Sequence, residues 1–309
     1  MKAWLETRQV LTQLAAWRAE GVRCALATVV RVRGSAYRHE GAKLVVAEDG
    51  RSVGNVSGGC LEEDVRAVAA RVIRTGTAER RSYCGGGDEV SAWDLGVGCE
   101  GEVEIVVEPV THAYDDERAA LAAEEPFEIS VGEFTERLAP PPRLLVVSAG
   151  DDARHVARVA ADVGFRVVVA DRRPGLLEPS RFPSGIHLVE TDAARLSERV
   201  VLDADSFAVV MTHHFADDVD YLRSLLRSPV RYLGVLGPRA RTERILGLLR
   251  REGQVDESRI FGPVGLDIGT DGAEQVALAI VAEVLAVRSG RRPRSLRERP
   301  RPIHVEQPE

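Results

Sequence analysis

The sequence predicts an α/β protein of two domains, an N-terminal α+β domain followed by a three-layer α/β domain with a mostly parallel sheet. A chain of 309 residues and 33.6 kDa is longer than one ordinary domain. Its second half alternates short apolar, β-branched runs with amphipathic stretches, which is typical of parallel strands covered by helices on both faces. The triplet Pro140-Pro141-Pro142 separates this half from a first half without such regular alternation.

The composition excludes several classes of protein. Hydrophobic residues make up 44% of the chain and charged residues 29%, as in average globular proteins. The longest nearly apolar stretch, Val276 to Val287, contains Glu283 and is shorter than the ~20 residues of a membrane span. The first residues do not form a secretory signal, and a net charge of −7 argues against general nucleic-acid affinity. We therefore expect a cytoplasmic protein with no membrane span and no nucleic-acid partner.

The first domain is expected over residues 1–110. A helix is predicted from about Glu6 to Ala19, because Val10, Leu14 and Trp17 repeat at i, i+4 and i+7. A second amphipathic helix is expected from Leu61 onward. Strands are expected at 22–32, 43–47 and 101–107.

Residues 111–139 are expected to link the two domains as a helix and a short strand, since acidic residues alternate there with alanines and leucines at helical spacing. The second domain is expected over residues 140–290, with helices between its strands. Residues 291–309 carry arginines among prolines and are expected to form a basic, disordered tail. The strands predicted in the second domain are 143–147, 165–170, 186–189, 207–211 and 232–235.

The motif Gly58-Gly59-Cys60 precedes the helix expected from Leu61. Two glycines allow a tight turn whose N–H groups can bind an anion at the positive end of a helix. At such a place the thiolate of Cys60 is favoured, which increases its reactivity and its affinity for metals. The acidic run Glu62-Glu63-Asp64 opposes a second negative charge. A reactive thiol and a buried, inert cysteine beside a glycine turn are therefore equally compatible with the motif.

Two other glycine loops are weaker candidates. Cys99 lies in the first of them, before a predicted strand. The second loop, from Gly34 to Lys43, contains Arg38 and could hold a phosphate, but alone its pattern favours a solvated turn. The four cysteines form no C-x-x-C pair, so neither a disulfide scaffold nor a structural zinc site is expected.

The turn after the first strand of the second domain reads Ser148-Ala149-Gly150-Asp151-Asp152-Ala153. Compared with the dinucleotide pattern G-x-G-x-x-G/A, it keeps the middle glycine, ends in alanine and begins with serine. Asp171 ends the next strand, where a ribose-binding carboxylate would lie. This order predicts a Rossmann-like unit with Gly150 and Asp171 as candidate nucleotide contacts. Asp151 and Asp152 either repel a pyrophosphate or cap the helix.

Two more candidates follow strands of the second domain. His213 comes after the strand that ends at Met211, at the edge where open α/β sheets bind ligands. A binding role and a solvated loop histidine are equally compatible with this place. Asp267 is the one charged residue of the stiff loop 263–269, so it caps, pairs or binds. No nucleophile–base pair or Walker loop is recognisable, and no catalytic residue is assigned.

Taken together, these motifs resemble the xanthine dehydrogenase accessory factor (XdhC/CoxI) family. The resemblance runs in the family's order from about Leu5 to Gly290. In the first domain it rests on Gly34–Arg38 with Gly41-Ala42, on Ser57–Glu62 and on Leu95–Cys99. In the second domain it rests on Met211–His213, Tyr232–Arg239 and Gly262–Gly269.

The resemblance implies a chaperone whose cargo is the molybdenum cofactor, molybdopterin with its metal. Such proteins protect the cofactor while a cysteine desulfurase supplies its terminal sulfur, and they help to insert it into a xanthine dehydrogenase-like molybdenum hydroxylase. Cys60 is then expected to contact molybdenum or to carry sulfur. Gly58, Gly59 and Arg38 are expected to hold the anionic part of the cargo, with Cys99 as a further candidate. A homodimer is compatible with the family.

The alternative function is an NAD(P)-dependent oxidoreductase that uses the Rossmann-like domain. It needs an intact pyrophosphate turn and a proton donor such as His213. Ser148, Asp151 and Asp152 favour the chaperone.

Overall fold

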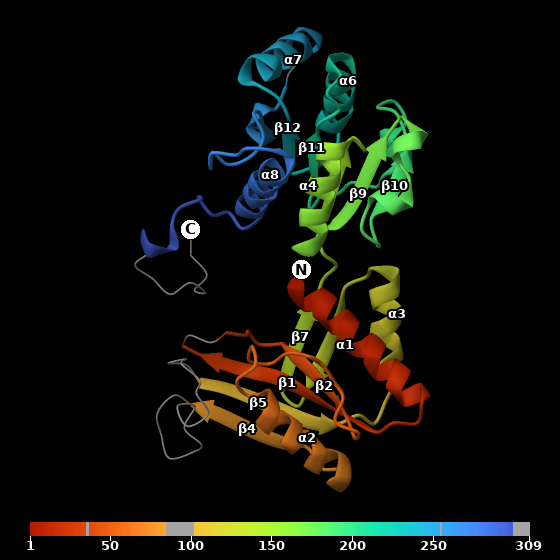
Figure 1. The fold of residues 1–309 in the computed structure, drawn as a ribbon, viewed down its shortest axis with the longest axis vertical. Helices are drawn as coiled ribbons and strands as arrows, with labels where there is room; N and C mark the ends of the chain where they lie inside the picture. The colour runs from red at the N-terminus through yellow and green to blue at the C-terminus, as the bar shows by residue number, and fades with distance from the viewer. Residues whose placement is uncertain (35–36, 85–101, 254, 299–309) are drawn as a thin grey trace. The chain divides into compact units, whose positions relative to one another are not determined.

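The chain folds into two compact units, which are described separately (Figure 1). The first comprises Met1–Pro140 together with the segment from Leu296 onward, and the second comprises Pro141–Ser295. The computed structural model describes residues 1–34, 37–84, 102–253 and 255–298. Cys99 and most of the basic tail lie outside these ranges. In the described residues no helix is long and apolar enough to cross a membrane.

The first unit contains, within the described residues, a five-stranded antiparallel sheet of order β3-β2-β1-β5-β4. Side chains of a strand alternate between the two faces of the sheet. Ala25 and Ala27 therefore pack with α2, whereas Leu26 packs with α1. The elements are α1 (Lys2–Ala19), β1 (Cys24–Arg33), β2 (Lys43–Ala47), β3 (Ser52–Gly54), α2 (Glu62–Thr75), β4 (Glu79–Cys84) and β5 (Glu102–Pro109).

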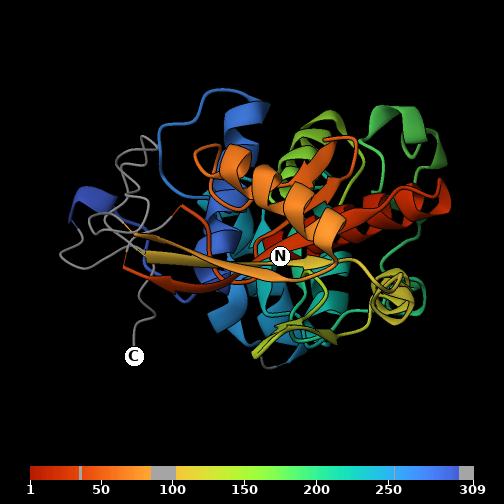
Figure 2. The ribbon, with the colours of Figure 1, turned by 90° about the horizontal axis from the view of Figure 1, so that it is seen from below.

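The stretch expected as a linker adds α3 (Asp115–Ala123) and a hairpin of β6 (Phe127–Val131) and β7 (Phe134–Leu138) to the first unit. Its helix is present, but two strands stand where one was expected. Ile129 and Leu138 are buried in the same core as α1, which gives the hairpin one apolar face. Figure 2 shows α2 on one side of the five-stranded sheet and this hairpin on the other.

The second unit contains, in its described part, a six-stranded parallel sheet of order β10-β9-β8-β11-β12-β13. Numbered from the first strand of the unit, this is the order 3-2-1-4-5-6 of the Rossmann fold. The predicted fold class is confirmed. The strands are β8 (Arg143–Val147), β9 (Arg166–Asp171), β10 (His187–Glu190), β11 (Phe207–Val210), β12 (Tyr232–Val235) and β13 (Ile260–Phe261).

Helices cover both faces of this sheet. The helices α4 (Asp151–Asp162) and α8 (Ala273–Arg288) pack together on one face. On the other face, α5 (Leu196–Arg199), α6 (Phe215–Leu226) and α7 (Arg239–Glu252) bury a common apolar core. Short 3₁₀ turns complete the described chain at Pro174–Leu176, Pro179–Arg181, Glu257–Arg259 and Leu296–Glu298.

The expectation of a helix between every pair of strands is wrong for β9 and β10. Two 3₁₀ turns connect these strands. Proline lacks the N–H group that a helix interior needs. Pro174, Pro179 and Pro183 therefore prevent a longer helix in this connection.

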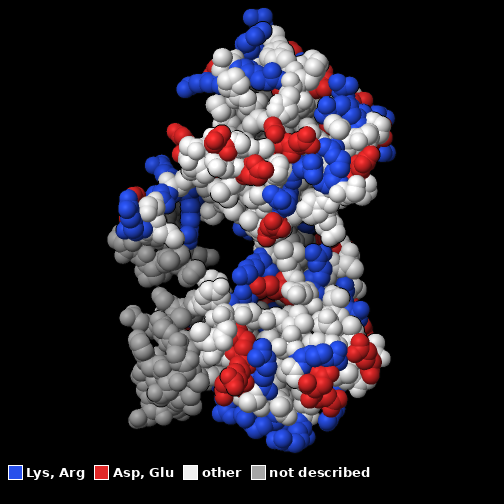
Figure 3. Space-filling view, viewed as in Figure 1, with Lys and Arg blue, Asp and Glu red and all other residues white. Residues whose placement is uncertain are grey.

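Charged side chains of both signs are interspersed over the described residues on the face drawn in Figure 3. Many of them form ion pairs, such as the pair of Arg223 with Glu252.

Candidate functional site

Cys60 lies in an exposed loop that leads from β3 into α2. Gly58 and Gly59 have φ angles of 94° and 117°, which glycine adopts without strain. Among the cysteines whose side chains the structure describes, Cys60 is exposed and Cys24 is buried, and both are free thiols. The interpretation of Cys60 as a buried, inert cysteine is therefore wrong, and its thiol is open to a ligand.

Glu62 holds this loop from inside. Its side chain is 6% exposed. One carboxylate oxygen accepts hydrogen bonds from the N–H groups of Val56 (3.2 Å) and Ser57 (2.9 Å), and the other accepts from the N–H of Gly59 (2.8 Å) and the Ser57 hydroxyl (2.5 Å). Burial acts to raise the pKa of Glu62, but the hydrogen bonds from Ser57 and the backbone outweigh it and hold this pKa below its ordinary value.

The anion cradle expected from Gly58 and Gly59 is already used within the loop. The Gly59 N–H donates to Glu62, and the Gly58 N–H donates to Asn55 Oδ1 at 2.8 Å. The predicted turn is present, but both of its N–H groups bind side chains of the protein. An anion at this position would have to compete with Glu62 and Asn55 for these donors.

Arg38 is 8% exposed and pairs with Glu6 of α1. One guanidinium nitrogen donates to Glu6 Oε1 at 2.9 Å, and a second donates to Oε2. The Nε atom is buried and has no hydrogen-bond partner in the described residues. The side chain expected to be a free cation therefore ties the loop between β1 and β2 to α1, and an anionic ligand would have to share it with Glu6.

Tyr37 places an aromatic ring against the loop of Cys60. The side chain is 69% exposed. A Cβ atom at Gly58 would lie 2.5 Å from Cδ1 of the ring, so the ring rests on this glycine and leaves no room for a larger residue. Tyr37 was not among the residues predicted for the site. Its signal in the sequence was an aromatic residue within a glycine-rich loop.

In the second unit, Gly150 is the N-cap of α4 in the turn after β8. The Ala149 N–H donates to Asp171 Oδ2 at 2.7 Å, and the Gly150 N–H donates to Ser148 Oγ at 3.1 Å. Ser148 is buried and has a φ of 150°, in the backbone region that favours glycine. The turn therefore resembles a dinucleotide turn in shape, while two of its N–H groups already have partners.

Asp171 is buried at the end of β9, beside this turn, as predicted. Its Oδ1 also accepts hydrogen bonds from the N–H and Nε of Arg173, both at 2.9 Å. Burial acts to raise the pKa of Asp171, but the hydrogen bonds from Arg173 and Ala149 hold it below its ordinary value. The carboxylate expected to bind a ribose thus holds the protein's own loop.

His213 lies at the same edge of the sheet, since β11 is the neighbour of β8. Its Nε2 is 3.2 Å from Oδ2 of Asp152 in the first turn of α4, and both side chains are exposed. His213 has a left-handed φ of 61°. Asp151, the preceding residue, forms ion pairs with Arg154 and Arg181. The start of α4 therefore carries two carboxylates with cationic or histidine partners.

Asp218, which was not predicted as a site residue, holds the loop that carries His213. It is almost completely buried. Its carboxylate accepts hydrogen bonds from the N–H of Thr212 at 3.2 Å and from Nε of Arg241 at 3.1 Å. The signal that could have found it is an aspartate on the buried side of an amphipathic helix.

Asp267 is exposed and makes no hydrogen bond or ion pair among the residues that the structure describes, so of the three expected roles neither capping nor pairing is seen there. Its loop is held to α8, because the Gly265 N–H donates to Glu283 Oε2 at 3.0 Å. Tyr232 donates its hydroxyl to the same carboxylate. Over the described ranges, no group of three or more histidine, cysteine, aspartate or glutamate side chains could hold a metal ion.

Two family models match this chain. The model of the XdhC and CoxI family matches residues 17–84, which include Arg38 and Cys60. The model of the XdhC Rossmann domain matches residues 144–284, which include Gly150, Asp171 and His213. The two matches fall on the two units of the structure, and the chain belongs to the XdhC and CoxI family.

Individual relatives resemble the chain over most of its length. It is 29% identical to a probable xanthine dehydrogenase subunit of Bacillus subtilis, over 85% of this chain and 92% of that protein. It is 26% identical to the molybdenum cofactor insertion chaperone PaoD of Escherichia coli, over 87% of this chain and 84% of that protein. Among solved structures, a xanthine dehydrogenase from Bacillus halodurans matches with a TM-score of 0.78 and 28% identity, over 92% of this chain and 97% of that one.

Proposed function

We propose that the protein is a chaperone of the molybdenum cofactor, which it protects during sulfuration and helps to insert into a xanthine dehydrogenase-type hydroxylase. The family membership and the similarity to a protein named as a molybdenum cofactor insertion chaperone support this function. The structural observation that carries it is the exposed thiol of Cys60 on a loop that Glu62 holds in place.

Cys60 is the proposed contact to molybdenum. A thiolate is a soft ligand and suits a metal that also binds sulfur. The loop is held by hydrogen bonds to Glu62, so little conformational freedom is lost when a ligand binds to it. A single thiolate also suits a carrier, because the cargo must leave again. The sulfur itself would come from a cysteine desulfurase, which is therefore a proposed partner.

The organic part of the cofactor is proposed to lie along Tyr37. The exposed ring rests on Gly58, two residues before Cys60, so a flat heterocycle can stack on the ring while its metal end reaches the thiol. Arg38 is a further proposed contact for the anionic part of the cofactor. To make this contact, its guanidinium would have to leave Glu6 or bind Glu6 and the cofactor at the same time.

The alternative function as an NAD(P)-dependent oxidoreductase has less support. A pyrophosphate is normally held by free N–H groups of the glycine turn at the start of a helix. Here Ala149 and Gly150 donate to Asp171 and Ser148, and α4 begins with two aspartates. A homodimer stays a prediction.

The function is tested by activation of a cofactor-free hydroxylase. A xanthine dehydrogenase-type enzyme is produced without molybdate and incubated with cofactor-loaded protein. We expect activity to appear with the wild type and with Cys24→Ala, the matched control at the buried thiol. We expect little or none with Cys60→Ala. Equal activation by Cys60→Ala, or no activation by the wild type, would contradict the proposal.

A further inference from the structure

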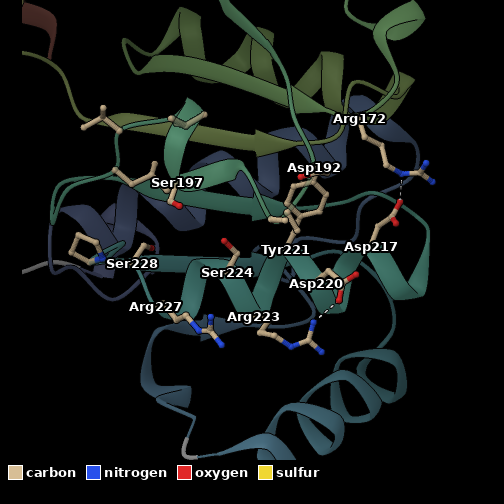
Figure 4. A pocket seen from close by; sticks show the side chains of 16 residues that line it. Arg172, Asp192, Ser197, Asp217, Asp220, Tyr221, Arg223, Ser224, Arg227 and Ser228 are labelled. Atoms are coloured by element: carbon tan, nitrogen blue, oxygen red, sulfur yellow. Dashed lines mark hydrogen bonds and ion pairs between the residues drawn. The ribbon is translucent and has the colours of Figure 1, made fainter.

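A groove in the second unit lies between α6 and the segment that connects β10 to β11 (Figure 4). Its cavity volume is about 890 Å³. Tyr221 and Ser224 line it from α6, and Ser197 and Leu202 line it from the connecting segment. One end of the groove, at Arg172 and Tyr221, adjoins the turn at Ser148 and Asp171, and the groove extends from there along α6 to Pro229. The function proposed above does not use it.

The groove exists because the connection contains very little helix. In doubly wound sheets, a parallel crossover usually places a whole helix on the face of the sheet. Here the crossover from β10 to β11 contains only α5, which has four residues. Leu196 and Val200 of this segment reach the core, but one helical turn cannot cover the length of α6, which has 12 residues. The space beside α6 is therefore left open.

The side of the groove that is formed by the segment between β10 and β11 is largely apolar. Ala193, Ala194 and Leu202 lie along it, and Val201 is 78% exposed. The hydroxyl groups of Ser197 and Ser224 point toward one another across the cavity (Figure 4). An apolar strip with a few hydrogen-bonding groups suits a peptide surface of mixed polarity.

The groove is lined by three arginines and three aspartates, and most of these charges are paired within the protein. Arg172 pairs with Asp217 at 2.8 Å, and Arg223 pairs with Glu252 at 2.6 Å. Arg227, which also lines the cavity, is exposed, and its guanidinium makes no hydrogen bond or ion pair among the described residues, although its charge contributes to holding the pKa of Glu252 low. It follows the last turn of α6, at one end of the groove. A carboxylate of a bound partner would complete its pairing.

We propose that this groove docks an amphipathic helix of the hydroxylase client, with its apolar side chains against the segment between β10 and β11 and a carboxylate against Arg227. The proposal rests on the function proposed above, because that function names the client. A helix fits because the open space runs beside α6, where a crossover helix would otherwise lie. Two to three helical turns, about 11–16 Å at 1.5 Å per residue, fit alongside the 12 residues of α6.

The experiment measures binding of the full chain to the immobilised cofactor-free hydroxylase at about 50 and 300 mM salt. Ser224→Trp fills the groove, and we expect it to weaken binding about tenfold or more at both salt concentrations. Arg227→Glu reverses the free charge, and we expect a similar loss that is smaller at high salt. The matched control is Arg251→Glu, an exposed arginine on α7 outside the groove, which should stay within about twofold of the wild type.

A second measurement does not depend on variants. We expect hydrogen exchange of the wild type to slow in 193–202 and 217–229 when the hydroxylase binds. Unchanged affinity of both groove variants, or absence of this protection, overturns the proposal. The hydroxylase would then bind to another surface, and the groove would be open to a different ligand, such as a small anion. Cofactor content is measured on the same wild-type preparation. A wild type that retains the cofactor but does not bind the hydroxylase overturns the docking proposal alone, whereas one that retains no cofactor overturns the proposed function.

Discussion

The hydroxyl oxygen of Ser148 accepts a hydrogen bond from the N–H of Gly150 at 3.1 Å. In a dinucleotide-binding turn this region of the backbone approaches a pyrophosphate. The serine thus stands at the first glycine position of the pattern. Its hydroxyl also takes up the N–H of Gly150, which in a dinucleotide-binding turn would be available to the pyrophosphate. Asp171 occupies a second donor, the N–H of Ala149.

The first prediction concerns dinucleotides. We expect NAD⁺, NADH and NADPH to show no binding below about 1 mM, which is a binding free energy weaker than about −4 kcal/mol. The physical reason is that the N–H groups of Ala149 and Gly150 already donate to Asp171 and Ser148, so a pyrophosphate would have to displace these partners. Isothermal titration calorimetry checks this, and micromolar binding would restore the oxidoreductase alternative.

The second prediction separates the two roles of Ser148. Ser148→Gly loses a hydrogen bond worth about 1 kcal/mol but removes a side chain from a φ of 150°, so the two effects nearly cancel. Ser148→Ala loses the same hydrogen bond and keeps the unfavourable φ. In urea unfolding we expect the free energy of unfolding of the alanine variant to be about 1 kcal/mol lower than that of the glycine variant. The reverse ranking would show that the backbone at this position is not strained.

The third prediction is a pH dependence at Glu62. Its pKa is lower in the folded protein than in the unfolded chain, where it is about 4.3. The carboxylate therefore stabilises the fold fully above that pH, and this contribution is lost as the pH falls through the folded pKa.

Glu62→Gln should accordingly lower the free energy of unfolding by about 1–3 kcal/mol at pH 7, since a charged acceptor of four hydrogen bonds is replaced. The difference between variant and wild type should shrink below about pH 4. Urea unfolding of both proteins at pH 7 and pH 3.5 measures it. Glu63→Gln, at an exposed neighbouring residue, is the control. A difference that does not change with pH would mean that the loop does not depend on the charge of Glu62.

The fourth prediction concerns Tyr37. Tyr37→Ala removes the exposed ring beside Gly58, and we expect it to weaken retention of the molybdenum cofactor about tenfold, as for the loss of one stacked ring. Tyr37→Phe keeps the ring and should retain the cofactor as the wild type does. Pterin fluorescence of the purified variants measures this. If Tyr37→Phe loses as much cofactor as Tyr37→Ala, the hydroxyl rather than the ring makes the contact.

The sequence predicted the second unit well because each strand buried on both faces reads as a continuous apolar run, such as Leu144–Val147. The missing helix between β9 and β10 was also predictable from its three prolines. The hairpin of β6 and β7 was harder to predict. Its strands are short and only one of their faces is buried, so the apolar signal is weak.

For the candidate site, the sequence predicted where the turns lie better than it predicted which groups their side chains and N–H groups bind. The glycine turn at Gly58 and the approach of Asp171 to the turn that contains Gly150 follow from local patterns. The hydrogen-bond partners of the site residues could not be predicted from local patterns. Arg38 pairs with Glu6 across 32 residues of sequence, a contact that only the packing of α1 on the sheet creates. Glu62 was expected to disfavour a second negative charge near Cys60. In the structure its carboxylate instead accepts hydrogen bonds from N–H groups of its own loop.

The central claim is that the Cys60 loop holds the molybdenum cofactor. The most direct test is the molybdenum and pterin content of the protein purified from a molybdate-supplied host, and after reconstitution with free cofactor, for wild type, Cys60→Ala and Cys24→Ala. We expect near-stoichiometric metal and pterin in the wild type and in Cys24→Ala, and their loss in a folded Cys60→Ala. Equal content in Cys60→Ala and wild type, or a wild type that stays empty after reconstitution, would contradict the account.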